Sequence, residues 1–176
     1  MTEQTGAPRH GDQVDRGAEW DDLRRRHLAP AEHRPATTAR GVHHLALLCR
    51  DVERTIGFYQ GVLGFPLVEL FENRDYQGST HFFFDIGQGN LLAFFDFPGL
   101  DLGPYAEVLG GLHHVAISVT AEEFDAARKR LAAAGVDVGA PDGVSESLYF
   151  RDPDGTRLEL LRAPLHEMGG RVLGAG

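Results

Sequence analysis

The sequence has little cysteine, no long apolar segment and a deficit of basic residues. Cys49 is the one cysteine among 176 residues, which excludes an internal disulfide framework and a cysteine-rich zinc site. No apolar run approaches the ~20 residues of a membrane-spanning helix. The chain carries 17 Lys and Arg against 26 Asp and Glu, a net charge of −9, so we expect no nucleic-acid partner and no membrane partner. The N-terminus lacks the apolar core of a secretion signal, so a cytoplasmic location is expected.

The two ends of the chain differ from its middle. Residues 1–40 hold seven Arg and seven Asp or Glu, so the whole deficit lies in residues 41–176, as 10 minus 19. This segment lacks strand alternation, and we predict an N-terminal tail with one short helix at residues 18–28. Residues 163–176 are predicted to be a second tail.

Between the tails the sequence repeats itself. Residues 41–47 (GVHHLAL) match residues 111–117 (GLHHVAI) at an offset of 70. Residues 81–95 (HFFFDIGQGNLLAFF) lie over residues 147–161 (SLYFRDPDGTRLELL) at an offset of 66, without gaps. The chain therefore contains two related modules, the second being shorter in its middle.

Each module shows the same order of local signals. A β-rich run at residues 42–49 or 112–119 precedes a helix, which begins after Asp51 or Thr120. Three short strands are predicted to follow, at residues 66–72, 80–86 and 91–97 in the first module and 136–140, 145–151 and 157–162 in the second.

A four-stranded sheet with one helix leaves its other face bare, and two such sheets can cover each other. We therefore predict an α+β fold in which two βαβββ modules form a shared, partly open barrel. The predicted boundaries are a tail at 1–40, modules at 41–97 and 111–162, a linker at 98–110 and a tail at 163–176.

Histidine pairs and one acidic residue are the candidates for metal chemistry. Each first strand carries two adjacent histidines, whose side chains point to opposite faces. Glu159 lies between two leucines, a position that is costly for a carboxylate without a partner. Two imidazoles and one carboxylate leave coordination positions open on Fe(II) or Mn(II). Ala93 is the counterpart of Glu159 in the first module, so it offers no fourth ligand.

Four spaced segments carry a family resemblance. They are residues 43–47 (HHLAL), 58–65 (FYQGVLGF), 113–117 (HHVAI) and 149–160 (YFRDPDGTRLEL). Over residues 41–162 the sequence resembles the vicinal oxygen chelate superfamily, which includes glyoxalase I, bleomycin and fosfomycin resistance proteins, and extradiol dioxygenases. The resemblance implies that His44, His114 and Glu159 hold a divalent metal. Fe(II) or Mn(II) is favoured, with Zn, Ni or Co as alternatives.

Two further residues are candidates for catalysis. Tyr149 matches the tyrosine of the extradiol dioxygenase signature, in which its hydroxyl helps to hold a substrate oxygen; its repeat mate is Phe83, so a core aromatic is the alternative. Residues 140–142 lack the histidine that this signature also has. His81 begins a Phe-rich run and is a candidate for proton transfer, with a polar strand-edge residue as the alternative.

The favoured function is an extradiol-type, ring-cleaving dioxygenase acting on a small aromatic or apolar substrate. Nine of the eleven Phe lie between residues 58 and 97, which suits such a substrate. The alternatives are a glyoxalase-like lyase or epimerase, which would need an acid where Ala93 stands, and a non-catalytic, resistance-type binding protein. A fosfomycin-type transferase would need a cationic pocket. A homodimer is expected, and the sequence leaves open whether the modules pair within one chain or across two.

Overall fold

The computed structural model describes residues 15–138, 146–168 and 171–172. The chain divides into two compact units, with the boundary between Thr38 and Ala39. In the first unit, helix α1 (Gly17–His27) confirms the predicted short helix and is followed by the 3-10 turn η1 (Ala31–His33). None of the residues of α1 is buried. Among the described residues, no helix is long and apolar enough to cross a membrane.

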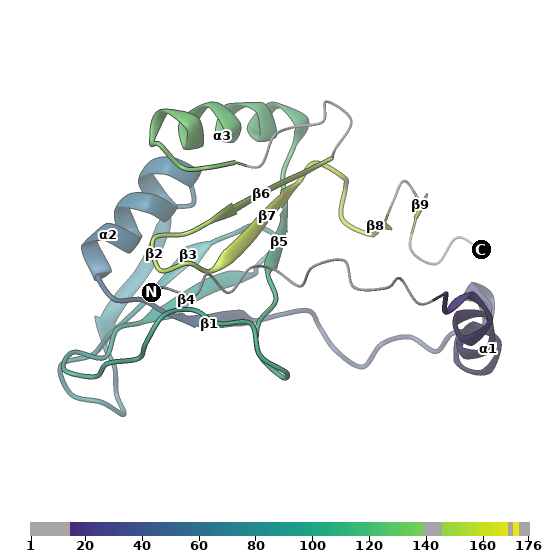
Figure 1. Ribbon diagram of the computed structural model, residues 1–176. Helices are drawn as coiled ribbons and strands as arrows, with labels where there is room; N and C mark the ends of the chain where they lie inside the picture. Colours follow the sequence, from purple (N-terminus) through teal and green to yellow (C-terminus); the bar gives the residue numbers. More distant parts are fainter. Residues whose placement is uncertain (1–14, 139–145, 169–170, 173–176) are drawn as a thin grey trace, which may run out of the picture. The chain divides into compact units, whose positions relative to one another are not determined.

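The first module is a four-stranded sheet with a helix on one face (Figure 1). Its strands are β1 (His44–Leu48), β2 (Leu67–Glu72), β3 (Thr80–Asp85) and β4 (Leu91–Phe95). Their order in the sheet is β1-β4-β3-β2, with β1 parallel to β4 and the other pairs antiparallel. This order places β1, which carries His44, at one edge of the sheet.

The second module repeats this arrangement with β5 (Val115–Ser118), α3 (Ala121–Ala133), β6 (Ser147–Arg151) and β7 (Arg157–Leu161). The described strands have the order β5-β7-β6, so β5 is also an edge strand. Strand β5 begins three residues later than predicted. Before it, the hydroxyl of Tyr105 donates to the carbonyl oxygens of Leu112 and His113. Of the strand predicted at 136–140, residues 136–138 form no strand and the rest lies outside the described residues.

The C-terminal part of the chain contains one pairing that the sequence did not predict. Strands β8 (Glu167–Met168) and β9 (Arg171–Val172) pair antiparallel where the sequence predicts only a tail. Two-residue strands carry few ladder hydrogen bonds and almost no periodic signal, so pattern reasoning does not detect them.

The first helix changes its winding part-way. Helix α2 (Val52–Ile56) begins after Asp51, whose side chain accepts a hydrogen bond from the backbone N–H of Arg54. It continues as the π-helical segment η2 (Gly57–Leu63), not as the α-helix that the spacing predicts. The wider winding separates successive residues by a smaller rotation, so Phe58 and Tyr59 are both buried.

The two modules are joined on their helical side. The buried hydroxyl of Tyr59 donates to Oδ2 of Asp152, in the turn between β6 and β7, at 3.0 Å. Arg130 of α3 donates to two backbone carbonyl oxygens at the end of η2. The backbone N–H of Arg50 donates to Asp154 at 3.1 Å. One continuous apolar core lies between the helices and both sheets.

The Tyr59–Asp152 pair lies in a protected environment. Burial raises the pKa of Asp152 above its ordinary value, although its carboxylate accepts hydrogen bonds from Tyr59 and from the backbone N–H groups of Asp154 and Thr156. Burial and the nearby Asp152 charge raise the pKa of Tyr59 well above its ordinary value. The phenol therefore stays protonated and keeps donating at neutral pH.

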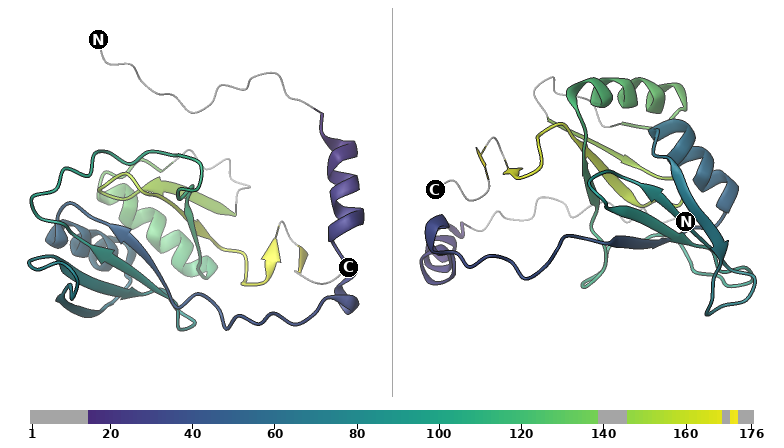
Figure 2. Two further views of the ribbon diagram at one scale, coloured as in Figure 1. Left: turned by 90° about the horizontal axis from the view of Figure 1, so that it is seen from below. Right: turned by 180° about the vertical axis from the view of Figure 1, so that it is seen from behind.

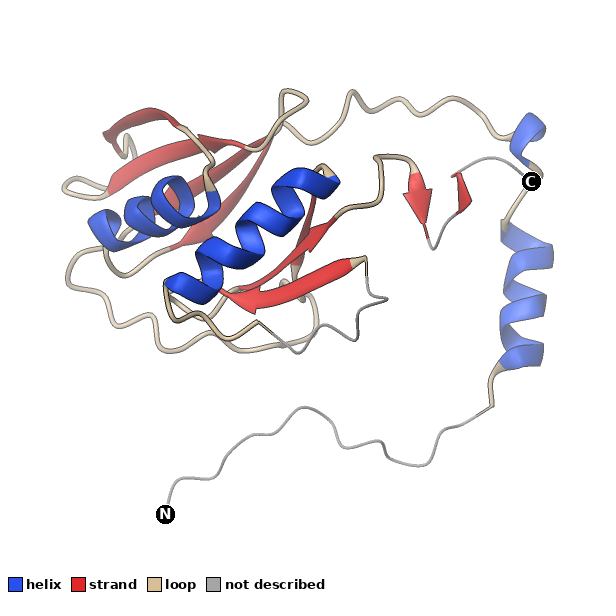
Figure 3. Cartoon of the chain, turned by 90° about the horizontal axis from the view of Figure 1, so that it is seen from above, coloured by secondary structure: helices blue, strands red, loops and turns tan. Residues whose placement is uncertain are grey.

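Helices α2 and α3 lie side by side on one face of the two sheets, with η2 against α3 (Figure 3). Figure 2 shows the opposite faces of the sheets from below, where no helix covers them. We call these the open faces. The α+β architecture of two βαβββ modules is therefore confirmed, but within one chain the sheets do not close into a barrel.

Replacing Tyr59 by phenylalanine is expected to destabilise the protein by about 1–3 kcal/mol, because it leaves a buried carboxylate oxygen without its donor. Urea unfolding of the metal-free protein at pH 7 measures this loss. Tyr76→Phe is the matched control, since Tyr76 is partly exposed and contacts Phe97 through its ring. An equal effect of the two substitutions would contradict the assigned role of the Tyr59–Asp152 hydrogen bond.

Candidate metal centre

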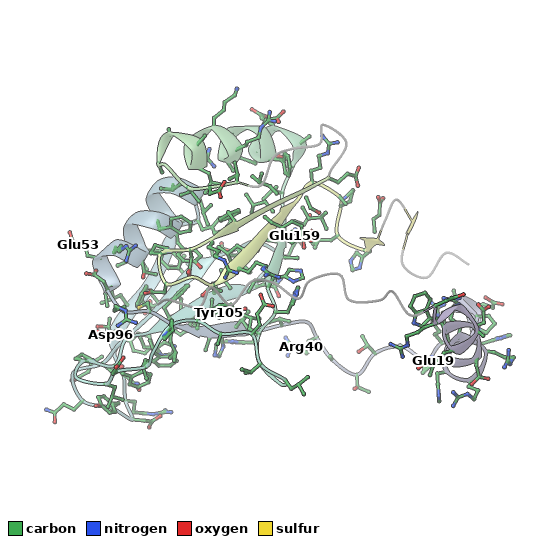
Figure 4. The ribbon with its side chains drawn as sticks, in the orientation of Figure 1. Glu19, Arg40, Glu53, Asp96, Tyr105 and Glu159 are labelled. Atoms are coloured by element: carbon green, nitrogen blue, oxygen red, sulfur yellow. The ribbon has the colours of Figure 1, made fainter. Side chains whose placement is uncertain are left out.

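Strand alternation places three of the predicted site residues on the open face of the second module. Along β7, Leu158 and Leu160 are core residues, so the side chain between them, Glu159, points to the other face. Glu159 pairs in register with Tyr149 of the neighbouring strand β6. Figure 4 labels Glu159 on β7. His114 directly precedes β5, which pairs with β7 on its other side.

His114 and Glu159 are in direct contact. Nε2 of His114 lies 3.0 Å from Oε2 of Glu159, whose residue is only 7% exposed. The Tyr149 ring lies edge-on to His114 with ring centroids 5.8 Å apart. Burial, followed by the hydrogen bond and charge of Glu159, raises the pKa of Tyr149, so its hydroxyl stays protonated at neutral pH. A neutral phenol next to a carboxylate can donate a hydrogen bond to a substrate oxygen.

The rings of each histidine pair contact each other, so the expectation that they point to opposite faces is wrong: His43 and His113 lie before their strands, where side chains do not alternate. Nδ1 of His43 lies 2.9 Å from Nδ1 of His44, and Nδ1 of His113 lies 2.6 Å from Nδ1 of His114. In both expected ligands the Nδ1 atom is thus occupied, which leaves Nε2 as the atom that can coordinate a metal.

Arg157 and Glu107, which the sequence did not indicate as site residues, hold the His113–His114 pair in place. Nη1 of Arg157 lies 3.1 Å from Nε2 of His113, and Nη2 of Arg157 lies 2.6 Å from Oε1 of Glu107 in the linker. A guanidinium can only donate, so Nε2 of His113 accepts and its proton lies on Nδ1, toward Nδ1 of His114. Nδ1 of His114 then accepts, so the proton of a neutral His114 lies on Nε2, toward Glu159. Coordination of a metal by Nε2 of His114 would require a change of this tautomer. The two-residue spacing of Arg157 and Glu159 indicates a shared face, but no signal in the sequence identifies Glu107.

The open face of the first module is aromatic. His44 lies edge-on to Phe83, with ring centroids 5.8 Å apart. The ring of His81 stacks on Phe95 at 3.8 Å and lies 4.3 Å from Phe83, and Phe71 contacts both His81 and Phe83. Nε2 of His81 is buried and has no hydrogen-bond partner among the described residues. Burial, and then the neighbouring His44, lower the pKa of His81, so its imidazole is neutral at pH 7.

The structure does not bring all three expected ligands together within one chain. In the part of the chain that the structure describes, no three His, Cys, Asp or Glu side chains lie close enough to hold one metal ion. The reason is that the modules meet through their helices, whereas His44 and the His114–Glu159 pair lie on the open faces. The donor types fit a divalent metal, and the assignment of the three ligands stays a prediction.

Comparison with known proteins places the chain in a family. The model of the Glyoxalase/Bleomycin resistance protein/Dioxygenase superfamily matches residues 41–160. The chain belongs to this superfamily. It is the family that the repeat and the histidine pairs predicted.

The relatives of this superfamily member differ in reaction. The chain is 32% identical over 133 residues to metallothiol transferase FosB of Shouchella clausii (strain KSM-K16), covering 72% of this chain and 83% of the relative. It is 30% identical over 120 residues to catechol-2,3-dioxygenase of Bacillus subtilis (strain 168), covering 68% and 40%. Among solved structures, a FosX mutant from Listeria monocytogenes complexed with Mn(II) is 25% identical, with a TM-score of 0.55 and coverage of 73% and 96%. Members of the family therefore use divalent metals in several chemistries.

The environment of His81 can be tested directly. In the metal-free protein we expect the pKa of His81, measured from its imidazole NMR signals, to lie below the ordinary histidine value. Because the folded protein binds this proton more weakly than the unfolded chain does, the free energy of unfolding is expected to fall as the pH drops below the ordinary pKa of histidine. Phe95→Ala opens the stacked face to water and is expected to raise this pKa. An unchanged pKa of His81 in Phe95→Ala would show that burial by Phe95 does not lower this pKa.

Proposed function

We propose that the protein is a divalent-metal-dependent enzyme whose site is completed by two chains. His44 of one chain and the His114–Glu159 pair of the other would hold the metal. Three protein ligands leave coordination positions for substrate, because Ala93 occupies the position equivalent to Glu159 in the first module. When bound, the metal would supply Lewis-acid chemistry to two adjacent oxygens of a chelating substrate.

The edges of the two sheets support a site between chains. Strands β1 and β5 are edge strands, and neither has a partner on its outer side among the described strands. An unpaired edge and a bare apolar face both favour association with another chain. Three large side chains on the open faces are 44–48% exposed in one chain: Leu48 on β1, Phe71 on β2 and Tyr149 on β6. Pairing one chain's first module with another chain's second module would bury these residues and bring the ligands together.

The reaction best supported is extradiol-type cleavage of an aromatic ring. The observation that carries this proposal is the row of aromatic side chains next to His44 on the open face of the first module. Beside the expected metal position, the described residues offer no free cationic side chain, since Arg157 is bonded to Glu107 and His113. Tyr149 would hold a substrate oxygen, as its protonated hydroxyl lies beside Glu159. His81 would take up a substrate proton, because it is a neutral imidazole on the same face as His44. Closing the two open faces on each other would exclude water.

A metallothiol transferase is the second candidate. The chain spans 83% of the FosB relative but only 40% of the catechol dioxygenase, so its size favours the transferase. The charge of the site opposes this alternative, since Arg157 is already bound to Glu107 and His113 and is not free to hold a phosphonate. Assaying both reactions on the same preparation separates the two candidates.

The two-chain site is tested by mixing two inactive variants. His44→Ala and His114→Ala each remove one ligand, and we expect each pure variant to lose tight Mn(II) binding. In a mixed dimer, the first module of the His114→Ala chain would meet the second module of the His44→Ala chain, so one of two sites is intact. Electron paramagnetic resonance of bound Mn(II) after unfolding and refolding the mixture measures the recovery. No recovery in verified mixed dimers would show that the site is not shared.

The reaction is tested with Tyr149→Phe. We expect Fe(II)-loaded protein to convert a catechol to a yellow ring-cleavage product with uptake of O2. Tyr149→Phe is expected to lower kcat by about 10- to 1000-fold, the usual effect of losing one positioned donor, while bound metal is unchanged. Tyr76→Phe, away from Glu159, is the control. Thiol addition to fosfomycin without cleavage of any catechol would favour the transferase instead.

A further inference from the structure

A cavity lies at the far end of the edge strand β1, where its walls include Leu47 and Cys49 of the core face as well as Ala46 and Leu48 of the open face. It has a volume of about 540 Å³ and lies between the ends of β1 and β4 and the linker that joins the modules. Most of its walls are apolar: Leu48, Phe97, Leu100, Leu102, Tyr105 and Leu112. This volume lies within the range of small-molecule sites, which are mostly apolar with a few polar groups.

The cavity and the expected metal position share one face of the same strand. His44, Ala46 and Leu48 alternate onto the open face along β1. Ala46 and Leu48 line the cavity, and His44 precedes Leu48 by four residues, roughly 13 Å at the rise of a strand. The small side chain of Ala46 stands between them, so nothing bulky on β1 separates the cavity from His44.

Aromatic rings connect the two places on the neighbouring strands. From His44 they continue through Phe83, His81 and Phe95 to Phe97 at the cavity, with ring centroids 3.8–6.0 Å apart. Such a row offers contact to a flat or elongated apolar molecule along its whole length.

The charged groups at the cavity disfavour an anion. Asp96 and Asp154 line it, and Figure 4 labels Asp96 and Tyr105 at this end of the first sheet. The cation that lines it, Arg50, donates through its guanidinium to the carbonyl oxygen of Gly103 at 3.2 Å. A phosphonate or carboxylate group would therefore meet two carboxylates and an arginine that is already bonded.

We propose that this cavity is a subsite for an uncharged aryl substituent of the substrate. The inference rests on the proposed function, since it places the chelating head of the molecule at the metal and the substituent at the linker. The substrate class is then an aryl-substituted aromatic diol. Leu102 on the linker and Leu48 on β1 both line the cavity and would contact the substituent.

The experiment compares catechol with 4-phenylcatechol, using dissociation constants from titration of the Mn(II)-loaded protein under nitrogen. We expect 4-phenylcatechol to bind about 10- to 100-fold more tightly, the gain for burying one phenyl group. Leu102→Asp is expected to abolish that gain and leave catechol binding unchanged. Leu165→Asp is the matched control, because Leu165 is also about half exposed but does not line the cavity.

A probe that cannot chelate separates this inference from the proposed function. Saturation-transfer NMR on metal-free protein is expected to detect binding of 4-phenylphenol, and Leu102→Asp but not Leu165→Asp is expected to remove it. This result supports the subsite even if no catechol is cleaved. Equal affinities of catechol and 4-phenylcatechol, or equal effects of the two aspartate substitutions, would overturn the subsite and leave the metal centre untouched.

Discussion

The two modules meet through a shared apolar core on their helical sides, and this core contains a buried hydrogen bond, from Tyr59 to Asp152. This hydrogen bond joins the first helix of one module to a turn of the other, at 3.0 Å and away from water. Arg130 and Arg50 add contacts on the same side. Because the helical sides are used for this contact, the opposite faces, which hold the histidines, cannot cover each other within the chain.

This constraint gives the open faces an unusual composition for exposed surfaces. They carry a buried glutamate bonded to a histidine, a row of aromatic rings and two unpaired strand edges. Each of these features is costly in water and becomes favourable when a complementary face covers it. Under the proposed function, one chain therefore holds half of the site, and a second chain would offer the other half.

The sequence alone predicted the features that depend on the internal repeat and on the alternation of side chains along a strand. Two related modules, their strand faces and the pointing of Glu159 follow from the offset of the repeat and the period of a strand. The hydrogen bond between Tyr59 and Asp152 was not predictable. Residues 152–155 have the composition of an ordinary tight turn, and Tyr59 has the spacing of an ordinary core residue. The contacts of Arg157 with Glu107 and the cavity beneath the linker depend on the path of the linker, which has no periodic pattern. The π-helical winding of η2 was missed for the same reason: it depends on packing around Phe58 and Tyr59.

The differences between the two modules explain why neither could form a site alone. Where the second module has Glu159, Tyr149 and Arg157, the first has Ala93, Phe83 and Leu91 at the same positions of the repeat. The second face therefore supplies a carboxylate and a phenol, whereas the first supplies His44, His81 and an apolar wall. Two first-module faces together would hold no carboxylate at the position of Glu159, and two second-module faces would lack the aromatic row of β3 and β4. In the proposed site, only the pairing of unlike faces would both chelate and stack, and because the helical contact keeps the open faces of one chain apart, that pairing would need two chains.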